Sequence, residues 1–403
     1  MSRFLQLHLL TNYPPANLNR DDTGRPKTAL MGDAQRLRVS SQCSKRAWRT
    51  SDAFTSALMQ GQLTPATPVV VQWDEVPHPH LGTRTKEVGV QVHKALTARG
   101  VKDKDAKAWA ASIAQQFGKL QKEKKDAPLN ELRIEQLCHL SPEERAAVDA
   151  LVQASAERQS APTDDELALL RAPQAAVDIA MFGRMLANSP AYNVEAAVQV
   201  AHAVTVHKAA VEDDWFSAVD DLNTGLEEKG AGHIGERGFG AGLFYQYVCV
   251  DRKLLGTNLG GDTALFKRAL GALLHAMTKV APTGMQNSHG SRAYASYVLA
   301  EKGDQQPRSL VQAFLKPIKP GEGGDMLELA VNAIEQRCKN FDEVYGKCAE
   351  ERFRINVERG NPKPEASPDD PRGLSTPNPK TPPKDPLGAI GSLDELVAFA
   401  QED

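Results

Sequence analysis

The sequence contains few cysteines for a chain of 403 residues. Five are present, at positions 43, 138, 249, 338 and 348, and none forms a Cys-x-x-Cys pair. The wide spacing and the odd number exclude a zinc ribbon and a disulfide framework, because both need clustered or paired cysteines. We therefore expect reduced thiols, as in a cytoplasmic protein.

Long apolar segments are also missing. The longest apolar run without a charge lies around Phe239–Val250 and is too short to cross a bilayer. Gln6 and His8 interrupt the short apolar stretch at the N-terminus, which argues against a signal peptide. The sequence therefore predicts a protein that is not secreted and has no membrane partner.

The common catalytic motifs are absent, since the sequence has no Walker A motif, no Gly-x-Ser-x-Gly and no His-Glu-x-x-His. His78 and His80 form one histidine pair, and His202 and His207 form another. No set of cysteines or carboxylates completes either pair, so we interpret these histidines as surface or core residues. We expect no bound metal and no cofactor.

Three acidic residues leave a catalytic alternative open. Asp21, Asp22 and Asp33 lie in and beside a basic loop. Carboxylates in that setting could support metal-dependent or general-base RNA cleavage. Acidic residues are also common in turns. A metal-dependent endoribonuclease using these residues is the alternative to a binding function.

The net charge is small, at −3, but the charges are unevenly distributed. Residues 1–50 contain nine basic and three acidic side chains, and residues 84–125 contain eleven basic and four acidic ones. Such an imbalance indicates a polyanionic partner for the basic part of the chain. For residues 84–125, a solvated helical face explains the charges equally well.

The basic residues of the first fifty follow a local pattern. Residues 35–41 alternate as a strand, which places Arg36 and Arg38 together on the face away from the core. The serines at positions 40 and 41 provide an N-cap for a helix over about Gln42–Met59.

Two cations, Lys45 and Arg46, then lie near the start of this helix, where the helix dipole makes positive charge unfavourable. A bound phosphate would compensate for this, because the free N–H groups of a helix start favour anions. The alternative is salt bridging to Asp21, Asp22 and Asp33, but three acids cannot neutralise nine bases. The pattern therefore predicts phosphate binding.

The rest of the chain predicts strands, loops and helices by its apolar periodicity. The expected elements are a strand over Phe4–Thr11, a polar loop over 12–33, mostly helices over 86–180, a strand over Leu243–Val250 and a helix over Asp262–Val280. Residues 361–386 contain nine prolines and predict a linker or extended arm. Ser392 to Glu395 form a capping box that opens a short C-terminal helix.

Two further motifs are weak. Arg237–Phe244 (RGFGAGLF) partly matches the RNA-recognition octamer, but Ala241 stands where a stacking aromatic is needed, and a glycine-rich turn before a core strand explains it better. Trp215 and Phe216 are adjacent, so on an extended segment one could pack while the other stacks on a base. Core packing of both is the simpler interpretation.

The sequence closely resembles the CasC family, the backbone subunit of the type I-E CRISPR surveillance complex, Cascade. The matching motifs occur in order over roughly residues 1–320. They are Asn17-Leu-Asn-Arg-Asp-Asp22, Arg36-Leu-Arg-Val-Ser-Ser-Gln42, Lys45-Arg-Ala-Trp-Arg-Thr-Ser51, Val177-Asp-Ile-Ala180, Gly183-Arg-Met185, Ala201-His-Ala203, Asp214-Trp-Phe-Ser-Ala-Val-Asp-Asp221, Gly232-His-Ile-Gly235, Phe244-Tyr-Gln-Tyr247 and Asn258-Leu-Gly-Gly261.

The resemblance implies an α+β fold, with an RRM-like (ferredoxin-like) palm, an inserted helical fingers domain and a thumb. The expected segments are palm over 1–60, helical fingers over 61–180, palm over 181–200, thumb over 201–243, palm over 244–355, a proline-rich arm over 356–390 and a C-terminal helix over 391–403. The proline-rich arm is the part that does not match the family pattern.

The resemblance also implies the function. Copies of such a subunit assemble head to tail along the spacer of a CRISPR RNA, and each thumb displaces a guide base at regular intervals, leaving the others to pair with target DNA. The implied guide contacts are Arg20, Lys27, Arg38, Ser40, Gln42, Lys45 and Arg49, and the implied base-displacing residues are Met185, Trp215 and Phe216.

The implied partners are the CRISPR RNA, the target DNA strand, other copies of the chain, other Cascade subunits and a recruited helicase-nuclease that does the cutting. The family is not catalytic. Backbone contacts from Arg and Lys hold a nucleic acid without reading its sequence, which suits a subunit that must accept any guide.

Overall fold

The computed structural model describes residues 2–59, 71, 73, 78–218, 233–319, 321, 324–360 and 385–402. It contains two compact units. The sheet unit comprises Met1–Phe54, Val200–Val250 and Leu270–Asp403, and the helical unit comprises Thr55–Gln199 and Asp251–Ala269. Residues 181–199 and 251–269, which the sequence analysis assigned to the palm, group with the helical unit. The proline-rich segment 361–384 lies outside the described residues.

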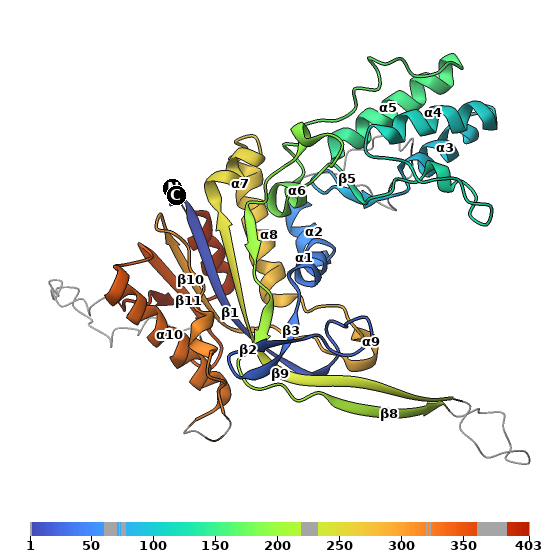
Figure 1. Cartoon of the computed structure of the whole chain (residues 1–403). Coiled ribbons are helices and arrows are strands. Elements are labelled where there is room, and N and C mark those ends of the chain that lie inside the picture. Colours follow the sequence, from blue (N-terminus) through green and yellow to red (C-terminus); the bar gives the residue numbers. More distant parts are fainter. Residues whose placement is uncertain are drawn as a thin grey trace, which may run out of the picture. The chain divides into compact units, whose positions relative to one another are not determined.

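The sheet unit is built on a mostly antiparallel sheet with the strand order β12-β11-β10-β1-β9-β7-β3-β2 (Figure 1). β8 pairs with the first part of β9 and forms a hairpin that extends away from the sheet. The strands are β1 (Phe4–Ala16), β2 (Thr28–Met31), β3 (Ala34–Val39), β7 (Ala203–Thr205), β8 (Glu212–Ala218), β9 (His233–Asp251), β10 (Ala295–Gly303), β11 (Glu351–Asn356) and β12 (Ala389–Ile390).

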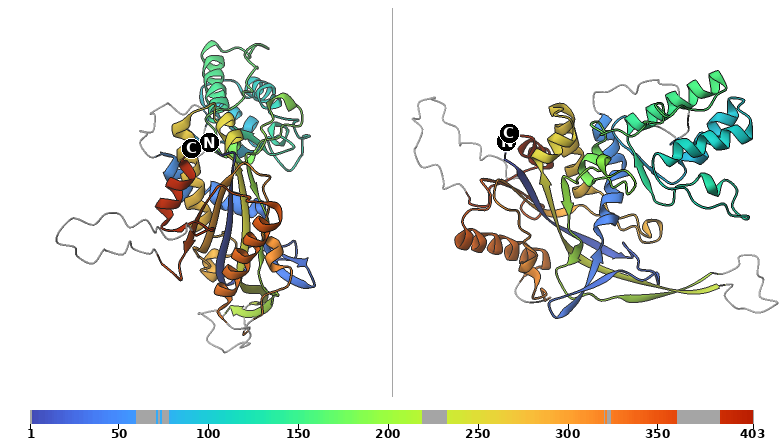
Figure 2. Two further views of the ribbon diagram at one scale, coloured as in Figure 1. Left: turned by 90° about the vertical axis from the view of Figure 1, so that its left-hand side faces the viewer. Right: turned by 45° about the horizontal axis from the view of Figure 1, so that its top comes forward.

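Helices pack on both faces of this sheet (Figure 2). On one face, Ile334 of α10 joins a core with Tyr297 and Leu299 of β10. On the other face, Phe399 of α11 stacks on Phe353 of β11, with ring centroids 5.7 Å apart. The helical segments of this unit are α1 (Ser41–Arg49), the start of α2 (Asp52–Met59), the end of α8 (Thr263–Lys279), α9 (Gln286–His289), η3 (Val311–Phe314), α10 (Met326–Tyr345) and α11 (Leu393–Gln401).

The helical unit has its own apolar core, in which Val92 and Leu96 of α3 meet Ile113 of α4 and Val152 of α5. A short two-stranded sheet pairs β4 with β5. The elements of the helical unit are β4 (Thr83–Thr85), α3 (Val88–Ala98), α4 (Asp103–Gln115), η1 (Asn130–Leu132), β5 (Cys138–Leu140), α5 (Pro142–Arg158), α6 (Val177–Phe182), η2 (Pro190–Tyr192) and α7 (Arg252–Asn258). β6 (Val198–Val200) lies at the boundary of this unit in sequence.

The mixed α/β architecture agrees with the expectation in outline, whereas the RRM-like topology stays a prediction. The expected polar loop over 12–33 is wrong in part, because β1 continues to Ala16 and β2 occupies Thr28–Met31. The expected helix over 42–59 is two helices. Ser51 ends the first by donating its hydroxyl to the Trp48 carbonyl, and it caps the second by accepting the Phe54 N–H.

Segment 237–244 is not a turn, as the sequence suggested, but an internal part of β9. Its glycines alternate along the strand, so they share one face. That face lies against neighbouring chain segments. A Cβ atom on Gly240 would lie 2.9 Å from both the Leu37 side chain and the Ala210 carbonyl oxygen, so close packing explains the glycine there.

The C-terminal helix begins as the sequence predicts. Ser392 accepts the Glu395 N–H and its own N–H bonds the Glu395 carboxylate, which is the predicted capping box. All five cysteines are free. Among the described residues, no helix has the length and apolar character needed to cross a membrane.

A buried ionic network crosses the sheet beneath α10. Glu301 of β10 is fully buried and pairs with Arg308 at 2.6 Å and with Arg352 at 2.8 Å. His8 of β1 lies 3.1 Å from the same carboxylate. Burial raises the pKa of Glu301, but the hydrogen bonds and charges of His8 and Arg308 outweigh that effect and hold the pKa well below its usual range. The carboxylate therefore stays ionised.

Replacing Glu301 by Gln should destabilise the sheet unit by about 3 kcal/mol, because it removes the carboxylate charge that compensates the largely buried Arg308 and Arg352. Chemical denaturation followed by circular dichroism measures the change. Glu343→Gln, at an exposed position of α10, is the matched control and should shift the free energy of unfolding by less than about 0.5 kcal/mol. Equal effects of the two substitutions would contradict this assignment.

Candidate nucleic-acid interface

The centre of the candidate interface is the joint between β3 and α1. Ser40 follows the strand directly and caps the helix, its hydroxyl accepting the Cys43 N–H at 3.3 Å. The Asn19 side chain holds this joint from the preceding loop by accepting the Ser40 N–H at 2.9 Å. The N–H groups of Ser41 and Gln42 lie before the helical hydrogen-bond ladder begins, so they remain available to an anion.

Three predicted contacts follow along one side of α1. Gln42, Lys45 and Arg49 are spaced by three and four residues, so they share a helical face, while Ala47 and Trp48 are buried on another. The first turn of the helix contains no acidic residue. Lys45 is half-buried, and this burial lowers the pKa of its ammonium group.

A second group of cations lies on the strand side of the joint. Arg38 of β3 donates through Nη1 to Nδ1 of His202 at 2.7 Å and through Nε to the Thr28 carbonyl at 3.4 Å. The Lys27 carbonyl accepts the Arg38 N–H at 2.8 Å. Both Lys27 and Arg38 act on His202: burial first, and then these two positive charges, lower its pKa.

Arg36 corrects the sequence interpretation, because it does not reach solvent from its face of β3. Its side chain is fully buried, and its guanidinium donates to the carbonyls of Thr205 at 2.9 Å and Phe314 at 2.8 Å. This arginine ties β3 to β7 and to η3. It is a structural residue, and the positive charge on this side of the joint comes from Arg38.

The loop before β2 adds further arginines around a cavity of about 370 Å³, which Arg20, Arg25 and Arg237 line together with Glu236. Arg20 donates to the Met285 sulfur at 3.6 Å. Arg25 pairs with Asp213 of β8 at 2.8 Å, so its charge is partly neutralised.

The acids considered for catalysis serve other purposes or stand apart. Asp21 closes a turn by accepting the N–H groups of Thr23 and Arg25 and the Thr23 hydroxyl, and these bonds, that of the hydroxyl foremost, lower its pKa. Asp22 and Asp33 are exposed. Within the described ranges, no group of three or more His, Cys, Asp and Glu side chains could hold a metal ion.

The two hairpin aromatics have different surroundings, and neither belongs to the core. Trp215 is 69% exposed. Phe216 is half-buried: its ring lies over Gly235, where an added Cβ would be 2.4 Å from the ring, and the Arg237 guanidinium lies 4.5 Å from its centroid. The interpretation that both pack in the core is therefore wrong, and Trp215 is the aromatic that a base can reach. Hairpin residues 219–232 lie outside the described part of the chain.

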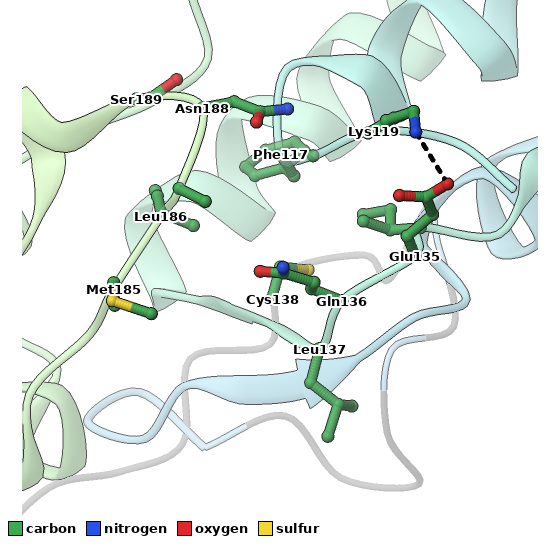
Figure 3. A pocket seen from close by; sticks show the side chains of 13 residues that line it. Phe117, Lys119, Glu135, Gln136, Leu137, Cys138, Met185, Leu186, Asn188 and Ser189 are labelled. Carbon is green, nitrogen blue, oxygen red and sulfur yellow. Dashed lines mark ion pairs between the residues drawn. The ribbon is translucent and has the colours of Figure 1, made fainter.

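Met185 lies in the helical unit and is 76% exposed. It stands at the rim of a pocket of about 90 Å³ that Leu137 and Leu186 also line (Figure 3). Lys119 and Glu135 form an ion pair of 3.0 Å across another part of the rim. An exposed thioether is a polarisable apolar group, suited to packing against a flat ring.

The structure therefore brings Lys27, Arg38, Ser40, Gln42 and Lys45 together around one helix start, with Arg49 farther along that helix. Met185 lies in the other unit, and Trp215 lies on the hairpin. The sequence indicated His202 only as a surface or core histidine and did not predict its place in this group. Its signal was its place in Ala201-His-Ala203, one of the motifs that carried the resemblance.

Comparisons with known proteins bear on the family and the fold of the chain. A family model described as "CT1975-like protein" matches residues 5–370. One solved chain, described as "CRISPR RNA-guided surveillance complex, pre-nicking", has a TM-score of 0.76 and 26% identity, covering 98% of this chain and 100% of that chain. Another, "CRISPR RNA-guided surveillance complex", shares the fold, with a TM-score of 0.66, 24% identity and coverage of 98% and 99%. No curated protein sequence matches significantly.

Trp215 should account for most of the tryptophan fluorescence that a water-soluble quencher can reach. Trp48 is 2% exposed and Trp109 is 9% exposed, and Trp73 is half-buried. We expect Trp215→Phe to remove most of the acrylamide quenching, whereas Trp109→Phe, the matched control, should leave it unchanged. Quenching of the same extent in Trp215→Phe as in the unaltered protein would contradict the exposure of Trp215.

Proposed function

The chain belongs to the family of CT1975-like proteins, and from this membership we propose that it is the backbone subunit of a type I-E CRISPR surveillance complex, Cascade. In this proposal, copies polymerise head to tail along the spacer of a CRISPR RNA and hold its phosphates. The 26% identical structural match over nearly the whole length of both chains supports a place in such a complex.

The observation that carries the proposal is the helix start of α1. This helix start is surrounded by two backbone N–H groups, by Lys27 and Arg38, and by the helical face that contains Lys45 and Arg49. No acidic residue lies in the first turn of the helix. Phosphate oxygens are the ligands that helix N-termini, lysine and arginine share. Such contacts fix a strand in position and leave its bases free to pair with target DNA.

The hairpin supports the assembly part of the proposal. Glu212, Asp213 and Asp214 give β8 an acidic start, and Trp215 exposes an aromatic ring beside them. A projecting acidic arm complements a basic surface on another copy. A contact between two different surfaces of the same protein builds a helical filament when it does not close into a ring. In this filament, Trp215, Phe216 and Met185 would displace guide bases at regular intervals.

We propose a non-catalytic subunit rather than the endoribonuclease alternative. Asp21 is engaged in its own turn, and in the part of the chain that the structure describes neither Asp22 nor Asp33 belongs to a group of possible metal ligands. Other Cascade subunits and a recruited helicase-nuclease would then supply target capture and cutting, in the cytoplasm.

Lys45→Ala combined with Arg49→Ala should weaken the binding of single-stranded RNA of any sequence. When a phosphate contact is lost, binding releases fewer counterions. The magnitude of the slope of log K against log salt should therefore fall by about 0.7 for each lost contact. Fluorescence anisotropy with a labelled RNA, measured at several salt concentrations, gives both quantities.

The matched control is Lys339→Ala combined with Lys347→Ala, which removes one exposed lysine of α10 and one that follows the helix. It should leave affinity and slope nearly unchanged. If the control lowers affinity as much as the Lys45 and Arg49 substitutions do, the binding is non-specific attraction and the assigned interface is wrong.

A complex purified with its RNA should leave complementary RNA intact in the presence of Mg²⁺. We expect no regularly spaced products on a denaturing gel, and no difference between the unaltered protein and Asp21→Ala. Regular cleavage that Asp21→Ala abolishes would establish the endoribonuclease alternative.

A further inference from the structure

His202 lies beside the helix start of α1 because of strand register. β3 and β7 are antiparallel, with Arg38 opposite Val204 and Val39 opposite Ala203. Continuing this register places His202 next to Ser40, the cap of the helix. The side chain of His202 is exposed at this point, so it faces the same solvent as the cations of the interface.

The hydrogen bond from Arg38 determines the tautomer of His202. A guanidinium has only donors, so Nδ1 of His202, 2.7 Å from Arg38 Nη1, must be the acceptor and cannot carry a hydrogen. The ring is then neutral and holds its hydrogen on Nε2. Burial and the charges of Arg38 and Lys27 lower its pKa, which keeps the ring neutral at pH 7.

The open Nε2–H group is therefore an uncharged donor in a cationic surrounding. Among the described residues, no acceptor faces it. Arg38 is oriented in return, because His202 holds its Nη1 and the Thr28 carbonyl lies near its Nε. These two hydrogen bonds use Nε and Nη1 of Arg38 and do not involve its Nη2 group.

We propose that His202 is a contact to the guide strand, donating Nε2–H to a phosphodiester oxygen of the same backbone segment that Arg38 binds. This inference rests on the proposed function. A neutral donor suits this position because a third cation beside Lys27 and Arg38 would repel both. Arg38 then attracts the phosphate by its charge, and the hydrogen bond from His202 fixes the orientation of the phosphate.

Three substitutions separate the donor from the other roles of His202. His202→Ala removes both ring nitrogens. In His202→Asn, the amide oxygen can still accept from Arg38, but no donor reaches the Nε2 position. In His202→Gln, the distal amide N–H lies about where Nε2–H lies. Because the position is exposed, thermal melting is expected to give the same midpoint for all three proteins.

The full-length protein is titrated against labelled single-stranded RNA at several salt concentrations. We expect His202→Ala and His202→Asn to bind about tenfold more weakly, as for the loss of a hydrogen bond to a charged group, and His202→Gln to restore most of the affinity. The salt slope should stay unchanged in all three, because a neutral donor displaces no counterion. Arg38→Ala should instead lower the slope by about 0.7.

Two results would overturn the inference. If His202→Ala binds as tightly as the unaltered protein, His202 makes no contact; if Asn restores binding and Gln does not, His202 only orients Arg38. Neither result affects the proposed function, provided that the Lys45 and Arg49 substitutions weaken binding. Should those substitutions also have no effect, the proposed function itself fails.

Discussion

The candidate interface depends on one constraint, which is that β3 runs directly into α1 through Ser40. The strand is fixed on both sides, by β2 and by β7, so the first turn of the helix has a fixed position and direction. Asn19 adds a hydrogen bond to the backbone of the joint. An anion-binding helix start works only when its N–H groups are held in place, and the sheet provides that rigidity.

Arginines of the same sheet have opposite roles according to their burial. Arg36 is enclosed, and carbonyls satisfy part of its guanidinium, while Arg352 and Arg354 are enclosed and paired with carboxylates. These residues stabilise the fold and contribute little to the field outside it. Arg38 is two residues from Arg36 and remains partly exposed. The positive charge available to a ligand is therefore smaller than the nine basic side chains of residues 1–50 suggest.

The hairpin of β8 and β9 carries acidic and aromatic side chains beyond the edge of the sheet. It pairs an acidic strand and an exposed Trp215 with a β9 strand that continues into the core, so the projecting arm is anchored by the same strand that supports β7. Arg25 ties the base of the arm to the basic loop through Asp213. In the proposed function, this arm contacts a neighbouring copy while the basic surface of the subunit holds the guide.

The sequence by itself determined the local features: an N-cap at Ser40 or Ser41, the basic spacing along α1 and the capping box at Ser392 all follow from short-range hydrogen bonding and periodicity. Family motifs added the residues of the proposed interface. The sequence could not distinguish Arg36 from Arg38, because both occupy the same face of one strand and only the packing of η3 over that face buries the first. It also could not assign His202, because its tautomer is set by Arg38, a residue that strand pairing brings near from 164 positions away. Burial and partner choice are properties of the assembled sheet, and only the tertiary structure decided them.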